Sequence, residues 1–247
     1  MLGLPTGIQA CLFDLDGVLT DTAAVHAAAW KEMFDEFLRD YATQHGIAFQ
    51  AFDARAEYDA YVDGKPRANG VRDFLTARGI TLPEGTADDP PSAMTVNGLG
   101  NRKNEAVQRR IRTEGVHVFE GSRRYLQAAE KAGFRRAVVS SSANTREVLD
   151  VTGLAQYVEQ IVDGVTIRTE GLNGKPAPDT FLAAAKGFGL EPSQAAVYED
   201  ALAGVSAGRS GHFGHVIGVD RVGQAAELKS HGADVVVRDL AELLENK

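Results

Sequence analysis

Two carboxylates stand one residue apart at the end of an apolar run, in residues 11–22, CLFDLDGVLTDT. In an extended segment, residues i and i+2 point to the same side, so the side chains of Asp14 and Asp16 are expected to share one space. Two like charges at this spacing raise each other's pKa, and a divalent cation relieves that repulsion. Mg²⁺ suits such a site because it prefers oxygen ligands and completes its shell with water and substrate phosphate. The pair therefore predicts a magnesium site that handles phosphate.

Three further motifs carry groups that would complement this pair. Glu199 and Asp200 end the run AAVYED and offer two more carboxylates. The segment VVSSSANT places Ser140 after another apolar run, with Ser141 beside it and backbone N–H groups before a helix, where they can hold a phosphate oxygen. Lys175 in GKPAPD precedes a turn and a helix, so its ammonium can neutralise phosphate and carboxylate charge.

Each motif also has a purely structural interpretation. Acidic pairs cap turns and helices, a Ser or Asn before a helix is an ordinary helix cap, and most lysines are solvated. The combination is more specific than any one motif, because acid pair, hydroxyl, lysine and acid pair follow one another along the chain. The sequence therefore predicts phosphoryl transfer through a phosphorylated aspartate.

The elements that must position these groups are short apolar strands separated by helices. Six segments fit buried strands, at 8–16, 135–142, 157–164, 195–200, 215–220 and 233–239. Helical patterns occupy 122–133, 143–153, 178–189, 201–208 and 222–232. This alternation predicts an α/β fold, a Rossmann-like parallel sheet with helices on both faces. Ligands of such sheets bind at the carboxyl ends of the strands, where this sequence has Asp14, Ser140, Asp163, Asp200, Asp220 and Asp239.

Residues 24–114 break the alternation. They begin with an amphipathic pattern at 26–46 and contain an irregular stretch at 81–98 and a polar helix candidate from residue 101 onward. No convincing pair of strands is found there. We therefore predict a helical cap domain of residues 24–114, inserted into an α/β core domain of residues 1–23 and 115–247.

Composition and charge narrow the range of partners. Lys and Arg number 26 against 34 Asp and Glu, and the formal charge of −8 disfavours binding to nucleic acid or to an anionic membrane. The single cysteine, Cys11, excludes an intramolecular disulfide. The first ten residues lack a secretory pattern, and no apolar run approaches the roughly 20 residues that span a bilayer. We expect a cytoplasmic monomer without nucleic-acid or membrane partners.

With these motifs the chain resembles the haloacid dehalogenase-like phosphotransferases, and within them the β-phosphoglucomutase-like group, over nearly its whole length. The resemblance implies that Asp14 in DLDGVLTDT is the nucleophile that becomes phosphorylated. It also implies that Asp16 is the general acid/base and that its backbone carbonyl binds Mg²⁺. Both aspartates would belong to the metal site. The other matched positions bind phosphate, Ser140 and Lys175, or complete the metal site, Glu199 and Asp200 in YEDALAG.

The resemblance extends to Trp30, which matches the mutase pattern, and to positions that would bind the substrate: Thr22, His26, Arg67, Lys103, Ser142 and Asn144. Arg67 matches an arginine that holds the substrate's second phosphate, and Lys103 matches a cap lysine that reaches the active site. Taken as residues alone, His26 and Trp30 fit a packed helix face equally well, and the two cations fit an ordinary surface.

Three features depart from the group's pattern. Ala143 stands where a lysine is frequent, Asp63 precedes Gly64 where a lysine is common, and the cap is longer. They concern the sugar that is accepted rather than the phosphoryl chemistry.

Two functions are consistent with this pattern. The first is a magnesium-dependent mutase that interconverts β-glucose 1-phosphate and glucose 6-phosphate through the 1,6-bisphosphate, since a closing cap excludes water. The alternative is a phosphatase for a small sugar phosphate, because the same core can pass the phosphoryl group to water. A signalling receiver domain is disfavoured by Asp16 and by the cap, and a silent metabolite-binding module by the presence of all four motifs. The dehalogenase branch is disfavoured because it needs no metal-site acids.

Overall fold

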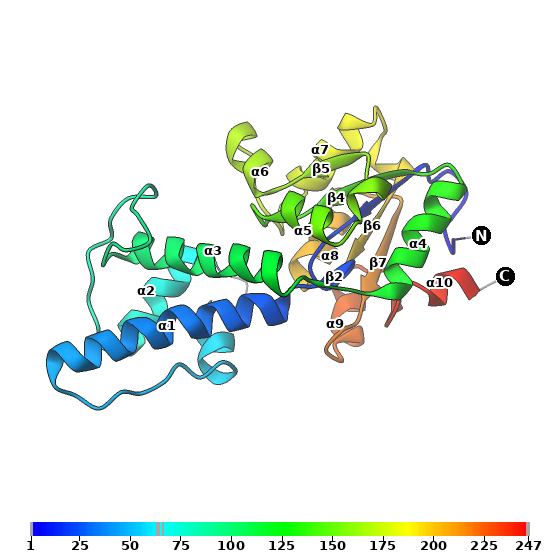
Figure 1. The fold of residues 1–247 in the computed structure, drawn as a ribbon. Helices are drawn as coiled ribbons and strands as arrows, with labels where there is room; N and C mark the ends of the chain where they lie inside the picture. Colours follow the sequence, from blue (N-terminus) through cyan, green and yellow to red (C-terminus); the bar gives the residue numbers. More distant parts are fainter. Residues whose placement is uncertain (1, 63–64, 66, 246–247) are drawn as a thin grey trace. The chain divides into compact units, whose positions relative to one another are not determined.

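The chain divides into two compact units. The computed structural model describes residues 2–62, 65 and 67–245. Met1–Thr22 and Val116–Lys247 form one unit, here called the sheet unit, and Ala23–Gly115 form the other, here called the helical unit (Figure 1). These limits lie one residue from the boundaries predicted above. That the two units fold as separate domains stays a prediction.

The sheet unit contains the parallel sheet that the apolar runs predict. Within the described residues, six strands pair in the order β5-β4-β1-β6-β7-β8, and every pairing is parallel. The strands are β1 (Ala10–Phe13), β4 (Arg135–Val139), β5 (Gln160–Val162), β6 (Ala195–Glu199), β7 (His215–Val219) and β8 (Val235–Val237). Every residue of β1, β6 and β7 is buried, which explains why these strands appear in the sequence as continuous apolar runs. The predicted fold class is confirmed.

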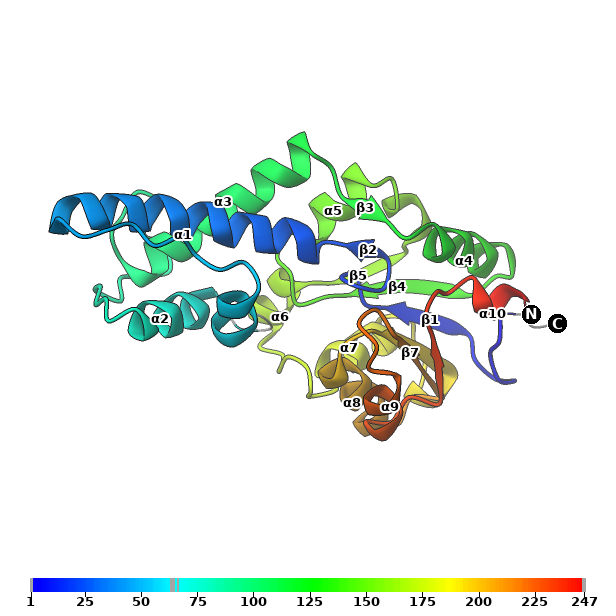
Figure 2. The same cartoon turned by 90° about the horizontal axis from the view of Figure 1, so that it is seen from below.

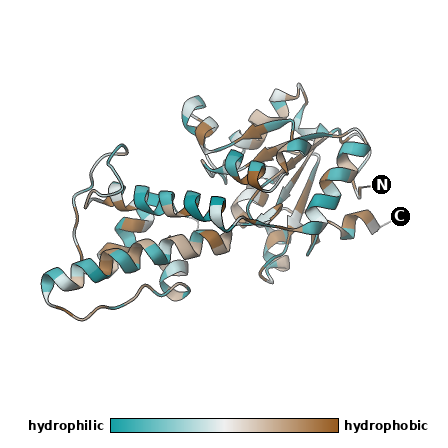
Figure 3. Cartoon of the chain, in the orientation of Figure 1, coloured by the Kyte–Doolittle hydropathy of each residue, from teal (hydrophilic) through white to brown (hydrophobic). Residues whose placement is uncertain are grey.

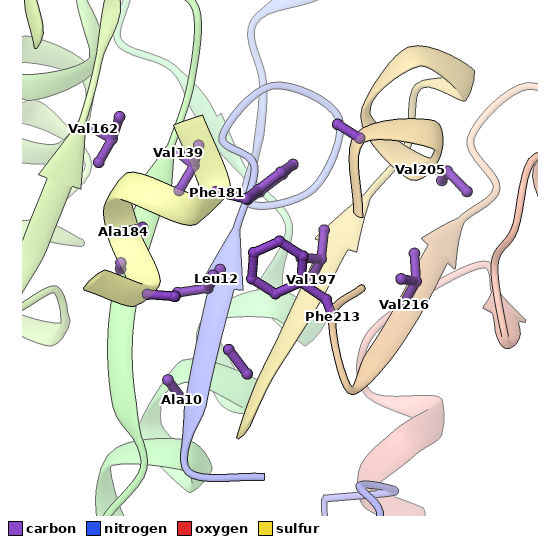
Figure 4. Packing of buried hydrophobic residues seen from close by; sticks show 14 of the residues in the cluster. Ala10, Leu12, Val139, Val162, Phe181, Ala184, Val197, Val205, Phe213 and Val216 are labelled. Carbon is purple, nitrogen blue, oxygen red and sulfur yellow. The ribbon is translucent and has the colours of Figure 1, made fainter. Parts of the chain in front are cut away.

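Helices cover both faces of this sheet. In Figure 2, α7 (Asp179–Gly187), α8 (Leu202–Ser210) and α9 (Ala225–Ser230) lie on one face and α4 (Glu120–Lys131) on the other. Successive side chains of β1 point to opposite faces of the sheet. Leu12 packs in the cluster that contains Phe181 (Figure 4). On the other face, the ring of Phe13 stacks on Tyr198 and contacts Tyr125 of α4 edge-on. Because both faces are covered, ligands can reach the sheet only at the ends of its strands.

Short elements complete the sheet unit. They are β2 (Thr20–Asp21), β3 (His117–Val118), α5 (Thr145–Val151), η2 (Ala155–Tyr157), α6 (Gly164–Glu170), η3 (Pro192–Gln194) and α10 (Glu242–Glu245). β2 and β3 pair antiparallel, so the two segments adjoining the helical unit form a small ribbon. The sequence did not predict α6, because Val165, Thr166 and Ile167 favour strands. The helix starts there because the Asp163 carboxylate accepts hydrogen bonds from two amides of its first turn.

The helical unit has its own hydrophobic core. It comprises α1 (Ala23–His45), the π-helical turn η1 (Tyr58–Val62), α2 (Arg67–Ala77) and α3 (Val96–Thr113), and its described residues contain no strand. Phe34 of α1 packs against Trp30, Phe52 and Phe74 with ring centroids 4.0–5.2 Å apart. The described elements of this unit are helical, as the sequence predicts, and its role as an inserted cap domain stays a prediction.

The hydropathy of the residues differs between the sheet and the helices around it. Figure 3 shows hydrophobic colour concentrated on the strands of the sheet and hydrophilic colour along α3 and α4. In the part of the chain that the structure describes, no helix is both long enough and apolar enough to cross a membrane.

Candidate active site

Three of the four motifs meet at one edge of the sheet because their strands are neighbours. β1 lies between β4 and β6, so the segments that follow these strands emerge side by side. Asp14 directly follows β1, and its amide donates to the Tyr198 carbonyl at 2.9 Å. Ser140 directly follows β4, and Glu199 is the last residue of β6. Parallel pairing therefore brings together residues that are far apart in the sequence.

Lys175, on the loop before α7, joins the motifs. Its Nζ lies 2.5 Å from Asp14 Oδ1 and 2.5 Å from Glu199 Oε1, and it donates to the Val139 carbonyl at 3.1 Å. The Lys175 and Asp14 side chains are each 11% exposed, and that of Glu199 is 1% exposed. The second oxygen of Glu199 accepts from the Ala201 amide at 2.9 Å, so this carboxylate is held at both oxygens.

The cluster has more negative than positive charge. Burial opposes the charged form of Lys175, but the carboxylates of Asp14 and Glu199 outweigh it and raise the pKa of this lysine. Burial, together with Glu199, Asp16 and Asp200, raises the pKa of Asp14 well above its usual value despite the adjacent ammonium. Burial and the charges of Glu199 and Asp16 likewise raise the pKa of Asp200 to about 8. The site therefore favours any further cation or proton.

The turn after Asp16 is packed tightly against Asp200. Gly17 has φ +81°, and its amide donates to the Thr20 carbonyl at 2.8 Å. A Cβ at Gly17 would overlap the Asp200 carboxylate. The hydroxyl of Thr22 donates to Asp16 Oδ1. The Gly17 backbone, directly after the first acid pair, therefore lies against the Asp200 carboxylate of the second. Any residue larger than glycine at this position would displace Asp200.

The loop after β4 is ordered by its own serines. Ser140 Oγ accepts from the Ser142 amide and Ser142 Oγ from the Asn144 amide, both at 3.1 Å. Because each hydroxyl accepts in these bonds, its proton remains able to donate to a phosphate oxygen. Ser140 and Asn144 are buried, whereas Ser141 is exposed. All four residues belong to the sheet unit.

The predicted residues of the helical unit form a second group. The Lys103 ammonium donates to Nδ1 of His26 at 2.9 Å and lies 5.0 Å from the ring centroid of Trp30. Arg67, at the start of α2, donates to the Gly100 carbonyl at 3.2 Å. Burial and the charges of Lys103 and Arg67 lower the pKa of His26 to about 3, so its imidazole is neutral at pH 7. Asp63 and Gly64 lie outside the described residues.

The fit of the acid cluster to Mg²⁺ depends on donor chemistry. Within the described residues, no group of three or more His, Cys, Asp or Glu side chains is arranged to hold a metal ion. The donor set is nevertheless oxygen-only, and after burial the repulsion among its carboxylates contributes to the raised pKa of Asp14 and of Asp200. In donor chemistry the residues fit a magnesium site.

Two side chains at this edge were not predicted as site residues. Arg221 donates to the carbonyl of Gly17 at 2.6 Å, and Gln224 donates to the carbonyl of Asp200 at 2.9 Å. Both follow β7, whose end was marked in the sequence by Asp220 alone. Their proximity to a strand end was the only available signal, because backbone carbonyl partners leave no pattern in the sequence.

Comparisons with known proteins agree with this arrangement. Residues 8–212 match the family model described as haloacid dehalogenase-like hydrolase. A β-phosphoglucomutase of Mycobacterium bovis is 59% identical over 247 residues, covering 99% of this chain and 94% of that protein. Hexitol phosphatase A of Escherichia coli is 28% identical, covering 96% and 93%. A crystal structure of β-phosphoglucomutase from Clostridium difficile superposes with a TM-score of 0.70 at 26% identity, covering 96% and 93%.

The family match spans most of the chain, and the fold agrees with that of the superposed structure. This chain is therefore an enzyme that belongs to the haloacid dehalogenase-like hydrolase family.

Proposed function

We propose that the chain is a magnesium-dependent phosphotransferase that interconverts β-glucose 1-phosphate and glucose 6-phosphate through the 1,6-bisphosphate. The observation that carries the chemistry is the buried contact of Lys175 with both Asp14 and Glu199 at the carboxyl edge of the sheet. The choice of sugar phosphate as the substrate is supported by the 59% identity to a β-phosphoglucomutase.

The reaction would proceed in two balanced steps. A carboxylate oxygen of Asp14 attacks the C1 phosphorus of the 1,6-bisphosphate in line, a bond from this oxygen to phosphorus forms and the bond to the sugar oxygen breaks, while Asp16 gives its proton to that oxygen and glucose 6-phosphate leaves. Asp16 then removes a proton from the 6-hydroxyl of β-glucose 1-phosphate, whose oxygen takes the phosphoryl group from Asp14 and restores the bisphosphate. The hydrogen bond from Thr22 to Asp16 would hold the acid/base in place. Lys175 would offset charge on the phosphate throughout.

The residues that would hold Mg²⁺ are Asp14, Asp16, Glu199 and Asp200. When bound, the ion would supply the positive charge that this cluster lacks and orient the phosphate for attack. Loading should therefore lower the pKa of the carboxylates that burial and mutual repulsion now raise.

Further residues would bind the substrate's two phosphates and its sugar. Ser140 and Ser141 would donate to the transferring phosphate, with Ser142 and Asn144 in the same loop. Arg67 would hold the second phosphate, since a guanidinium can bind it with two hydrogen bonds. His26 and Lys103 would act from the same end of the helical unit, where their contact gathers positive charge beside Arg67.

The alternative is a phosphatase that hydrolyses a small sugar phosphate. It uses the same first step, and water then replaces the sugar as acceptor. The 28% identity to a hexitol phosphatase over most of both chains supports it. For either activity, we propose a monomer in the cytoplasm, with a sugar phosphate as its partner.

One assay separates the two activities. The enzyme is incubated with β-glucose 1-phosphate, Mg²⁺ and a trace of the bisphosphate, and glucose 6-phosphate is measured against free phosphate. We expect glucose 6-phosphate as the main product. Exclusive release of free phosphate would reject the mutase and leave the phosphatase.

A variant tests the chemistry common to both activities. Asp14→Asn should abolish the phosphoenzyme detected by mass spectrometry and reduce turnover by about 10⁴-fold or more. Asp150→Asn, which changes an exposed carboxylate on α5, should retain both. A phosphoenzyme that persists in Asp14→Asn would contradict the nucleophile assignment.

A further inference from the structure

The loop after β7 is rigidly built, although no motif of the reaction lies in it. We call residues 220–224 the brace loop. Oδ1 of Asp220 accepts from the amides of Gly223 and Gln224 at 2.7 and 2.8 Å, and the Asp220 amide donates to Val237 of β8 at 2.8 Å. This Asx-type turn determines where the side chains of the brace loop point.

Arg221 directs its guanidinium at the segment that follows Asp16. Nε donates to the Gly17 carbonyl at 2.6 Å and one terminal nitrogen donates to the Val18 carbonyl at 3.3 Å. The other terminal nitrogen donates to the Arg238 carbonyl at 2.8 Å, and the guanidinium carbon lies 3.6 Å from the ring centroid of Phe119. A planar fork with this many fixed partners holds the turn after Asp16 in one position.

Gln224 reaches the other acid pair. Its side-chain amide donates to the backbone carbonyl of Asp200 at 2.9 Å. One loop thus contacts both acid-bearing segments, and those segments also touch each other where Gly17 meets the Asp200 carboxylate. The brace loop, the segment after Asp16 and the segment of Asp200 therefore each contact the other two.

We propose that the brace loop fixes the separation of Asp16 and Asp200, with Arg221 and Gln224 as positioning residues for the acid/base and for the metal-site carboxylate. This inference rests on the proposed function. Both side chains bind backbone carbonyls, so replacing them leaves every reacting group chemically intact. The expected defect is displacement, and displacement by about 1 Å costs on the order of 100-fold in rate.

The test uses the full chain with four variants. Arg221→Met keeps an unbranched side chain and removes the fork, Arg221→Lys keeps the charge, and Gln224→Met removes the amide. Arg238→Met is the matched control, because this exposed arginine contacts Arg221 and Glu242 through its backbone, and its charge makes only the smallest contribution to the lowered pKa of Asp220. Measured are kcat, KM for β-glucose 1-phosphate, and the Mg²⁺ concentration that half-saturates the rise in unfolding temperature without substrate.

We expect kcat to fall by about 10- to 100-fold in Arg221→Met and by about 3- to 10-fold in Gln224→Met, with KM changed less than about 2-fold. The half-saturating Mg²⁺ concentration should rise by about 5-fold or more in Arg221→Met. Arg221→Lys should recover only part of both losses, since an ammonium cannot bind three carbonyls in one plane. Arg238→Met should match the wild type.

The inference is overturned if Arg221→Met and Gln224→Met both equal Arg238→Met in kcat and in Mg²⁺ saturation. If Arg221→Met is unfolded without Mg²⁺, the inference is tested with Gln224→Met and Arg221→Lys instead. It is then overturned if both equal Arg238→Met in kcat and in Mg²⁺ saturation. Failure of the proposed function has a different signature: the wild type itself would show no phosphorylated Asp14. The Mg²⁺ titration needs no substrate, so it still tests the brace loop in that case.

Discussion

The central residue of the site is Lys175, because it offsets part of the charge that the acid pairs bring together. Its two carboxylate contacts, both 2.5 Å, are made in a largely buried place where unpaired charges are costly. One ammonium does not balance Asp14, Asp16, Glu199 and Asp200, which is why burial and mutual repulsion still raise the pKa of two of them. Buried clusters with pKa values shifted in this way are typical of functional sites.

At this scale Gly17 gives the sharpest prediction. Gly17→Ala should lose more stability than Gly7→Ala and also most phosphoryl transfer, whereas Gly7→Ala should stay active. Both glycines have positive φ, +81° and +100°, so each substitution carries a left-handed strain of about 1–2 kcal/mol. Only at Gly17 would the added methyl also displace the Asp200 carboxylate. Urea unfolding and kcat measure the two effects.

Gly7 provides the control because nothing lies within 4 Å of an added Cβ there. Equal activity in the two variants would mean that the contact between Gly17 and Asp200 does not position the site.

At the scale of elements, α1 and α3 join through a buried lysine and a neutral histidine. Lys103 is 3% exposed, and its ammonium is held by Nδ1 of His26 and lies near the ring of Trp30. His26 and Trp30 are four residues apart on one face of α1, which the packed-face interpretation explains as well as a substrate role does. The packing accounts for Trp30, whereas a lysine buried in this way calls for a further reason, which the proposed contact with substrate would supply.

This pairing predicts a pH dependence of stability. Burial, Lys103 and Arg67 lower the pKa of His26 from 6.5 to about 3, so the folded state resists a proton that the unfolded state accepts. The stabilising contribution is complete above pH 6.5 and declines as the pH falls towards 3. Between pH 6.5 and 5 the wild type should lose up to about 2 kcal/mol of unfolding free energy that His26→Gln does not lose.

Urea unfolding at the two pH values, followed by tryptophan fluorescence, measures this difference. His45→Gln is the control, because His45 lies exposed at the other end of α1. If His26→Gln keeps the wild-type pH dependence, the proposed cause is wrong.

At the scale of the whole molecule, each unit has hydrophobic packing of its own among the described residues. One cluster lies between the sheet and α7, α8 and α9, and a second core joins the aromatic side chains of the helical unit. The single tryptophan of the chain, Trp30, belongs to the second core. Its fluorescence therefore reports the helical unit, whereas circular dichroism reports both.

This difference tests whether the units unfold separately. Mg²⁺ with inorganic phosphate should stabilise the sheet unit, by about 2.7 kcal/mol at 100 times the dissociation constant. We expect the circular dichroism transition in urea to extend to higher concentration while the fluorescence transition stays in place. Trp30→Phe supplies the baseline. Coincident transitions with and without the ligands would show one cooperative unit.

The sequence was sufficient for the sheet because buried parallel strands are local apolar runs. All six predicted strands are present, with ends shifted by a few residues. The sequence did not predict α6, because a capping carboxylate overrides the strand propensity of its residues. It also did not predict α2 or the ribbon of β2 and β3, because these elements have no distinct local pattern. Roles assigned to the site residues stay predictions until the variants above are measured.

The sequence by itself determined which chemical groups the enzyme has, because the acid pairs, serines and lysine occur in short motifs beside apolar runs. Only the tertiary structure decided which of them meet. Lys175 contacts Asp14 across 161 residues, and Arg221 contacts Gly17 across 204. Contacts at such separations depend on strand order and loop packing. The pKa shifts depend on burial, and neither burial nor packing is a property of any local stretch of sequence.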